Sequence, residues 1–137
     1  MSLLSIFDVA GSGMAAQSAR LNTTASNMAN ADSLSSSEAT AYRAKSPTFA
    51  AVQRQVDGQT ENGGVRALGV TESQAPVQSR YEPANPLADA NGYVYSSNVN
   101  PVDELVNMIS ASRSYQNNVE VMNSAKQLMQ KTLDLGK

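Results

Sequence analysis

Hydrophobic and polar positions repeat most regularly in the last third of the chain. Asn100 is a favourable N-cap and Pro101 suits the first helical position, and two acidic residues follow near the positive end of the helix dipole. At the other end, Gly136 is expected to take the left-handed conformation that stops a helix. The pattern therefore predicts one helix over residues 101–135, roughly 50 Å long.

This predicted helix is longer than a compact body made from the same chain. A compact domain of 137 residues has a radius of gyration of about 14 Å, and so a diameter of roughly 37 Å. Two apolar stripes run along the helix, so both need cover. One antiparallel helix can cover only one of them, and the other is expected to meet another chain. The first stripe has heptad-like spacing and consists of Leu105, Met108, Ser112, Tyr115, Val119, Met122, Lys126, Met129 and Leu133. The second consists of Val121, Ala125, Leu128, Thr132 and Leu135.

A second heptad-like pattern predicts an N-terminal helix from Leu3 to Ala29, ended by Asn30. Its seam is Leu3, Phe7, Ala10, Met14, Gln17, Leu21, Thr24 and Met28. The helix is intrinsically weak, because each interior glycine costs about 1 kcal/mol relative to alanine. Two interpretations stay open for its small residues: a loosely specified helix, or a face that lets neighbouring helices approach closely. These residues are Gly11, Gly13, Ala15, Ala16 and Ala19.

The middle of the sequence predicts a small β-and-loop module. Residues 31–41 are polar and serine-rich, as in a loop or arm. A turn is expected at Gly63 and Gly64, and another at Asn91–Gly92. Short strands are expected over residues 65–70, 77–81 and 93–95.

The predicted fold class is therefore mainly α. Long N- and C-terminal helices pack as an antiparallel coiled-coil-like pair, with the small β/loop module inserted between them. The expected divisions are an N-terminal helix in 1–31, the middle module in 32–100 and a C-terminal helix in 101–137.

Composition removes most chemistry from consideration. The net charge is −2, from 10 basic and 12 acidic residues without clustering, so neither nucleic-acid binding nor direct membrane insertion is expected. Cysteine and histidine are absent, which removes thiol chemistry and the commonest general base. Asp103 and Glu104 are better explained by the helix dipole than by catalysis. We expect no enzyme activity and no catalytic residues, cofactor or metal site.

Two stretches resemble the bacterial flagellar basal-body rod proteins. The segment LNTTASNMANADS, residues 21–33, is similar to the Ser-Asn-apolar-Ala-Asn pattern shared by rod and hook proteins. Residues 98–137 are similar to the C-terminal helix of a proximal-rod subunit. The middle segments YRAKSPTF, GVRALGV and YEPANPLADANGYV follow in the expected order. The resemblance covers essentially the whole sequence.

The resemblance implies a structural subunit of the proximal rod, the hollow drive shaft that transmits motor torque across the periplasm. Its helices would form the inner layer around a central channel. Its partners would be copies of itself, other rod subunits, the adaptor between rod and membrane ring, and the flagellar type III export apparatus. The N-terminus lacks a basic start and carries Asp8 in its apolar stretch, so export without a cleaved signal peptide is expected. Weak helices would leave the free subunit's ends unfolded for export.

Candidate assembly residues come from the two seams and from the asparagine motif. They are Leu3, Phe7, Met14, Leu21, Asn27, Met28, Asn30, Leu105, Met108, Tyr115, Val119, Met122, Leu128, Met129 and Leu133. For Asn27 and Asn30 the alternatives are helix-end capping and hydrogen bonds between subunits. For the methionines and Tyr115 they are an intramolecular core and contact with a neighbour. A soluble coiled-coil adaptor or scaffold that homo-oligomerises is the alternative function.

Overall fold

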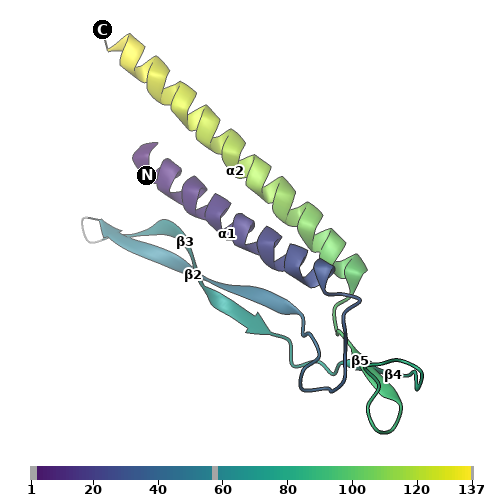
Figure 1. The fold of residues 1–137 in the computed structure, drawn as a ribbon. Coiled ribbons are helices and arrows are strands. Elements are labelled where there is room, and N and C mark those ends of the chain that lie inside the picture. The colour runs from purple at the N-terminus through teal and green to yellow at the C-terminus, as the bar shows by residue number, and fades with distance from the viewer. Residues whose placement is uncertain (1–2, 57–58, 137) are drawn as a thin grey trace.

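The computed structural model describes residues 3–56 and 59–136. Two long helices, α1 (Leu3–Ala29) and α2 (Pro101–Leu135), lie side by side and run antiparallel (Figure 1). The strands form between them in sequence. The predicted fold class is confirmed, and both helices have the predicted bounds.

Local signals explain both ends of α2. The side chain of Asn100 accepts a hydrogen bond from the amide of Val102 at 3.0 Å, as an N-cap does, and Pro101 is the first helical residue. The C-terminal prediction was wrong in one respect. Gly136 has φ −90°, not a left-handed value, because its amide closes a tighter turn onto the carbonyl of Leu133.

The strands form two separate antiparallel sheets. In the larger one, β2 (Lys45–Val56) and β3 (Gln59–Glu72) make a single long hairpin. The smaller sheet has the order β1-β5-β4, formed by β1 (Leu34–Ser35), β5 (Tyr93–Ser96) and β4 (Gln78–Tyr81). Predicted strands at 77–81 and 93–95 correspond to β4 and β5, whereas β1 lies in the segment expected to be a loop.

The hairpin departs most from the prediction. The strand expected over 65–70 is only part of β3, and the turn expected at Gly63 and Gly64 lies inside that strand. Gly64 does take a positive φ of 117°, but Gly63 has no partner in the register and forms a bulge. Strand β2, which contains Pro47, was not predicted. A two-stranded sheet has only edge strands, where proline is tolerated.

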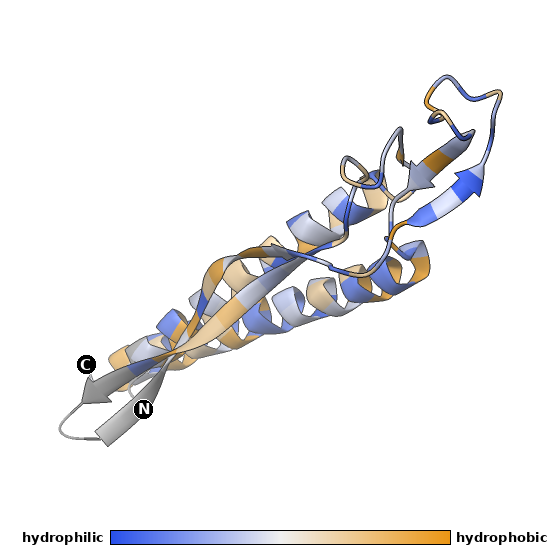
Figure 2. Cartoon of the chain, turned by 90° about the horizontal axis from the view of Figure 1, so that it is seen from below, coloured by the Kyte–Doolittle hydropathy of each residue, from blue (hydrophilic) through white to orange (hydrophobic). Residues whose placement is uncertain are grey.

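Helix α1 forms the middle layer of the molecule. It packs against α2 on one side and against the β2–β3 hairpin on the other (Figure 1). In the perpendicular view the hairpin runs along the helix pair, and β4 and β5 project beyond one end (Figure 2). Helix α2 therefore has only one neighbouring layer, and its opposite side is open.

Small side chains make up most of the core. The buried apolar residues of the described part are Ala10, Ala16, Ala41, Val94, Val99, Ala111 and Ala125. Within the predicted α2 seam, Leu105, Tyr115 and Leu133 are exposed, whereas five members are half-buried: Met108, Ser112, Val119, Met122 and Met129. The two buried residues of α2 are Ala111, outside that seam, and Ala125, from the second predicted stripe. Small residues suit an interface in which the helices approach closely, as Gly13 and Asn118 do.

Candidate functional site

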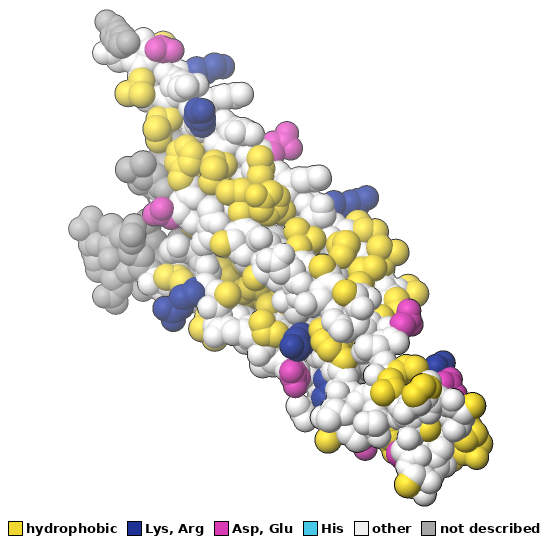
Figure 3. All heavy atoms as spheres, viewed as in Figure 1, with side chains coloured by type: hydrophobic (Ala, Val, Ile, Leu, Met, Phe, Trp, Pro, Cys, Tyr) yellow, Lys and Arg dark blue, Asp and Glu magenta, His cyan; other side chains and the backbone are white. Residues whose placement is uncertain are grey.

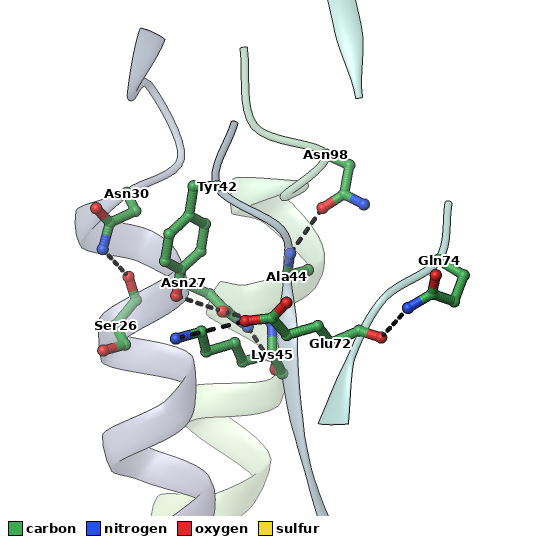
Figure 4. A network of polar contacts seen from close by, with 9 residues as sticks. All are labelled: Ser26, Asn27, Asn30, Tyr42, Ala44, Lys45, Glu72, Gln74 and Asn98. Atoms are coloured by element: carbon green, nitrogen blue, oxygen red, sulfur yellow. Dashed lines mark hydrogen bonds and ion pairs between the residues drawn. The ribbon is translucent and has the colours of Figure 1, made fainter. Parts of the chain in front are cut away.

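Asn27 joins three elements through its side-chain amide. Its Oδ1 accepts hydrogen bonds from the Lys45 amide at 2.9 Å and from the Tyr42 hydroxyl at 3.1 Å. Its Nδ2 donates to the Lys45 carbonyl at 2.8 Å and to Glu104 Oε1 at 2.9 Å. Figure 4 shows the side chain between α1, the start of β2 and α2. We call these four residues the Asn27 junction.

The junction corrects both interpretations of Asn27. An amide side chain has two acceptor sites and two donor hydrogens, and Asn27 uses all four within its own subunit. Only 1% of the residue is exposed. Asn27 therefore neither caps the helix end nor has bonding capacity left for a neighbour.

Asn30, in contrast, acts at the helix end as one alternative proposed. Its Nδ2 donates to the Ser26 carbonyl at 2.8 Å, and its own amide bonds the same carbonyl at 3.2 Å (Figure 4). These bonds satisfy a carbonyl that the end of α1 leaves without an intrahelical partner.

Further contacts surround the Asn27 junction. Burial is the main reason that the pKa of the Tyr42 hydroxyl lies above its ordinary value. The Lys45 ammonium lies 5.5 Å from the Tyr42 ring centre and 3.9 Å from Glu72 Oε1. The amide of Ala44 donates to Asn98 Oδ1 at 2.7 Å, which links β2 to the segment before α2 (Figure 4).

The two helices approach closely at Gly13. A Cβ at this position would lie 2.8 Å from Asn118 Nδ2, a distance that real Cβ contacts do not reach. Nearby on the same helix, a Cβ on Gly11 would only touch the Met122 methyl group at 4.0 Å. Close approach is therefore the better interpretation for Gly13, and Ala16 is buried as that interpretation expects, whereas Ala15 is exposed.

An apolar patch lies at the start of α2. We define the root patch as Val102, Leu105, Val106 and Ile109. Each member is about half exposed or more, and Val102 reaches 68%. Their spacing of three and four residues places them on one side of the helix, away from the residues that face α1. Figure 3 shows apolar side chains gathered over α2.

A second apolar surface follows the C-terminal half of α2. Val121, Leu128 and Leu135 repeat at intervals of seven residues, so they form a stripe along one flank, which we call the flank stripe. Leu135 is 89% exposed. Beside the stripe, a groove of about 450 Å³ is lined by Val121, Leu128 and, from α1, Ile6.

The predicted assembly residues occupy different environments. Half-buried between elements are Phe7, Met14, Leu21, Asn30, Met108, Val119, Met122 and Met129. At least a third exposed are Met28, Leu105, Tyr115, Leu128 and Leu133. Asn27 is buried, and the side chain of Leu3 lies outside the described residues. Sequence reasoning missed Val102, Val106 and Ile109, although their helical spacing was readable.

The described residues contain no arrangement suited to metal chemistry. Among residues 3–56 and 59–136, no group of three or more His, Cys, Asp or Glu side chains could hold a metal ion. Within the same ranges, every buried side-chain nitrogen and oxygen has a hydrogen-bond partner. None of the described helices has the length and apolar character needed to cross a membrane.

Known proteins match both helices and the full length of the sequence. The family described as Flagella basal body rod protein matches residues 7–33, and Flagellar basal body rod FlgEFG protein C-terminal matches residues 90–135. The flagellar basal-body rod protein FlgC of Salmonella typhimurium is 58% identical, with 99% of both chains aligned. The chain belongs to the FlgC family of flagellar basal-body rod proteins. The FlgC proteins of Escherichia coli O6:H1 and of Buchnera aphidicola from Schizaphis graminum are 55% and 45% identical, over 99% of both chains.

Membership of the FlgC family confirms the resemblance found in the sequence. The first matched segment covers most of α1 and the turn after it, including Asn27. The second covers β5 and α2, including the root patch and the flank stripe. The family assignment therefore rests on the same elements that carry the candidate site.

Proposed function

We propose that this protein, a structural subunit of the flagellar basal-body rod, assembles through the exposed apolar surfaces of α2. The observation that carries the proposal is the position of these surfaces. The root patch and the flank stripe lie on a helix that has only one neighbouring layer in its own subunit. In a monomer both surfaces stay in water, whereas rod neighbours would remove them from it.

The exposed area supports a subunit that is completed by its neighbours. The accessible surface is 9258 Å². A compact monomer of 14.5 kDa is expected to expose only about 6,900 Å². The difference arises because the molecule is elongated and its core contains mainly alanine. Assembly gives such a subunit the apolar burial that its own fold lacks.

The two apolar surfaces favour an open, helical assembly. The root patch lies on one side of α2 and the flank stripe on another, so they face different neighbours. Unlike surfaces that meet head to tail and do not close into a ring build a filament. Residues 1–31 and 101–137 would form the inner helical layer of a hollow shaft, with the module of residues 32–100 outside.

The finer aspects of the role come from the family resemblance. Assembly with other rod components follows from family membership. Within it we propose contacts with copies of the same subunit and with the adaptor between rod and membrane ring. We also propose export by the flagellar type III apparatus without a cleaved signal peptide, into a rod in the periplasm. The weak intrinsic helicity of α1, with two interior glycines, suits a protein that is exported unfolded.

An exposed charge in the root patch tests the proposal. Ile109→Glu places a carboxylate where a neighbour's apolar side chain is expected, at a position that is 48% exposed in the subunit. We expect a folded subunit that no longer restores motility to cells lacking the native protein and is absent from isolated basal bodies. Gln130→Glu, an equal change of charge at an exposed polar position of α2, is the matched control and should assemble.

If Ile109→Glu assembles as well as Gln130→Glu, the root patch is not an assembly surface. If the purified protein instead forms a stable, folded homo-oligomer that neither substitution disrupts, the result would support the adaptor alternative.

A further inference from the structure

The loop between β4 and β5 contains a dipeptide with known intrinsic reactivity. Asn91 is followed by Gly92, and the side chain of Asn91 is exposed. In a flexible Asn–Gly segment the glycine amide nitrogen attacks the asparagine Cγ. A new C–N bond closes a succinimide ring, the bond between Cγ and Nδ2 breaks, and ammonia leaves. Water then opens the ring to aspartate or isoaspartate, so the reaction needs only water.

The folded loop holds the attacking nitrogen in another interaction. The Gly92 amide donates to the Asp89 carbonyl oxygen at 3.0 Å, and the Gly92 carbonyl accepts from the Glu82 amide at 2.9 Å. The nitrogen must give up its hydrogen and rotate toward Asn91 before it can attack. The peptide groups on both sides of Gly92 are therefore hydrogen-bonded to other residues.

Asp89 fixes the residues on either side of Gly92. Its Oδ1 accepts from the Asn91 amide at 2.8 Å and from the Tyr93 amide at 2.9 Å. Gly92 has φ +83°, and a Cβ there would lie 2.8 Å from the Tyr81 ring. The position thus requires glycine, which is the residue that makes a preceding asparagine most reactive. The hydrogen bonds of the same loop restrain Asn91 and Gly92.

We propose that Asn91 is a deamidation site whose reactivity the fold controls. It reacts in the unfolded protein and is protected once the β4–β5 loop closes. Deamidation would place a second carboxylate two residues from Asp89, and the isoaspartate product would add a backbone atom inside the turn. A subunit modified while unfolded would then be unable to close the loop as the native one does.

The test compares the full-length protein in native buffer and in concentrated urea at one pH and temperature. Peptide mapping by mass spectrometry follows conversion of Asn91 from amide to acid. We expect at least tenfold slower conversion in native buffer, the ratio that an opening free energy of about 1.4 kcal/mol gives. Asn62–Gly63, the other Asn–Gly pair, reports the chemical rate in urea.

Two variants make the test specific. Asp89→Ala removes the acceptor of the Asn91 and Tyr93 amides, so its native rate should approach the urea rate. Asn91→Gln should abolish the signal from this peptide. Equal rates for the unsubstituted protein in native buffer and urea would overturn the proposal, and so would a native rate that Asp89→Ala leaves unchanged.

Discussion

At the scale of single residues, Asn27 has the largest structural role. Asn27→Ala would remove four hydrogen bonds and leave the Lys45 amide and carbonyl without a partner at a buried site. We expect a loss of about 2–4 kcal/mol in the free energy of unfolding. Because the core is small, this loss should appear as lower helical content by circular dichroism of the purified subunit.

Asn30→Ala is the matched control for this prediction. It removes one exposed hydrogen bond to Ser26 and should cost about 0.5–1.5 kcal/mol. Equal losses for the two substitutions would mean that Asn27 does not join the three elements as the hydrogen bonds indicate.

The role of Asn27 could not have been predicted from the sequence. Its partners Lys45 and Glu104 are 18 and 77 residues away in sequence. The sequence offered only local explanations, such as a helix cap, because local patterns hold no information on distant contacts. Asn30 bonds a residue only four positions away, so a helix-end role for it could be proposed from local sequence.

At the scale of elements, the α1–α2 interface distinguishes two neighbouring glycines. Gly11→Ala should stabilise the subunit by about 0.5–1 kcal/mol, because a Cβ there makes only an ordinary contact with Met122. Gly13→Ala should lack this gain, because its Cβ meets Asn118. In urea unfolding, adding Asn118→Ala to Gly13→Ala should restore the gain. Stabilisation by Gly13→Ala alone would contradict the close approach.

The β4–β5 loop carries a pH-dependent contribution to stability. A hydrogen bond from the Tyr93 amide is the main reason that the pKa of the Asp89 carboxyl lies below 3.8, its ordinary value. A lowered folded-state pKa gives stability that is present above pH 3.8 and is lost as the pH falls through the lowered pKa. Amide resonances of the loop should follow this loss in an NMR titration. Asp89→Asn should remove this pH dependence of the loop resonances. If the resonances of Asp89→Asn still titrate as those of the unsubstituted protein do, Asp89 is not the group responsible.

Helix bounds and most seam positions were predictable, whereas the hairpin was not. The N-cap at Asn100 and the terminator at Asn30 act within a few residues, so local sequence determined these helix ends. Strand β2 depends on pairing with β3, and local sequence does not show which segment a strand pairs with. The predicted α2 seam left out Ala111 because heptad patterns favour large side chains, and this interface also buries small ones.

At the scale of the whole molecule, the long elements form three layers, and both outer layers, α2 and the hairpin, have an uncovered face. Helix α1 has cover on two sides, from α2 and the hairpin, whereas α2 has cover on one (Figure 1). The prediction that α2 is apolar on more than one side agrees with its exposed flank stripe, whereas most of the root patch was not predicted. Which neighbour covers each surface depends on the geometry of the assembly, which one subunit does not determine.

The most direct measurement is thiol labelling of α2 in the free subunit and in isolated basal bodies. The sequence has no cysteine, so Ile109→Cys and Leu128→Cys each introduce a single thiol on an assembly surface. Ala111→Cys, at a buried position of α2, is the control: it should label slowly in basal bodies, and its rate in the free subunit reports whether α1 and α2 already pack there. We predict fast labelling of Ile109→Cys and Leu128→Cys in the free subunit and protection in basal bodies. Equally fast labelling of both in assembled basal bodies would contradict the account.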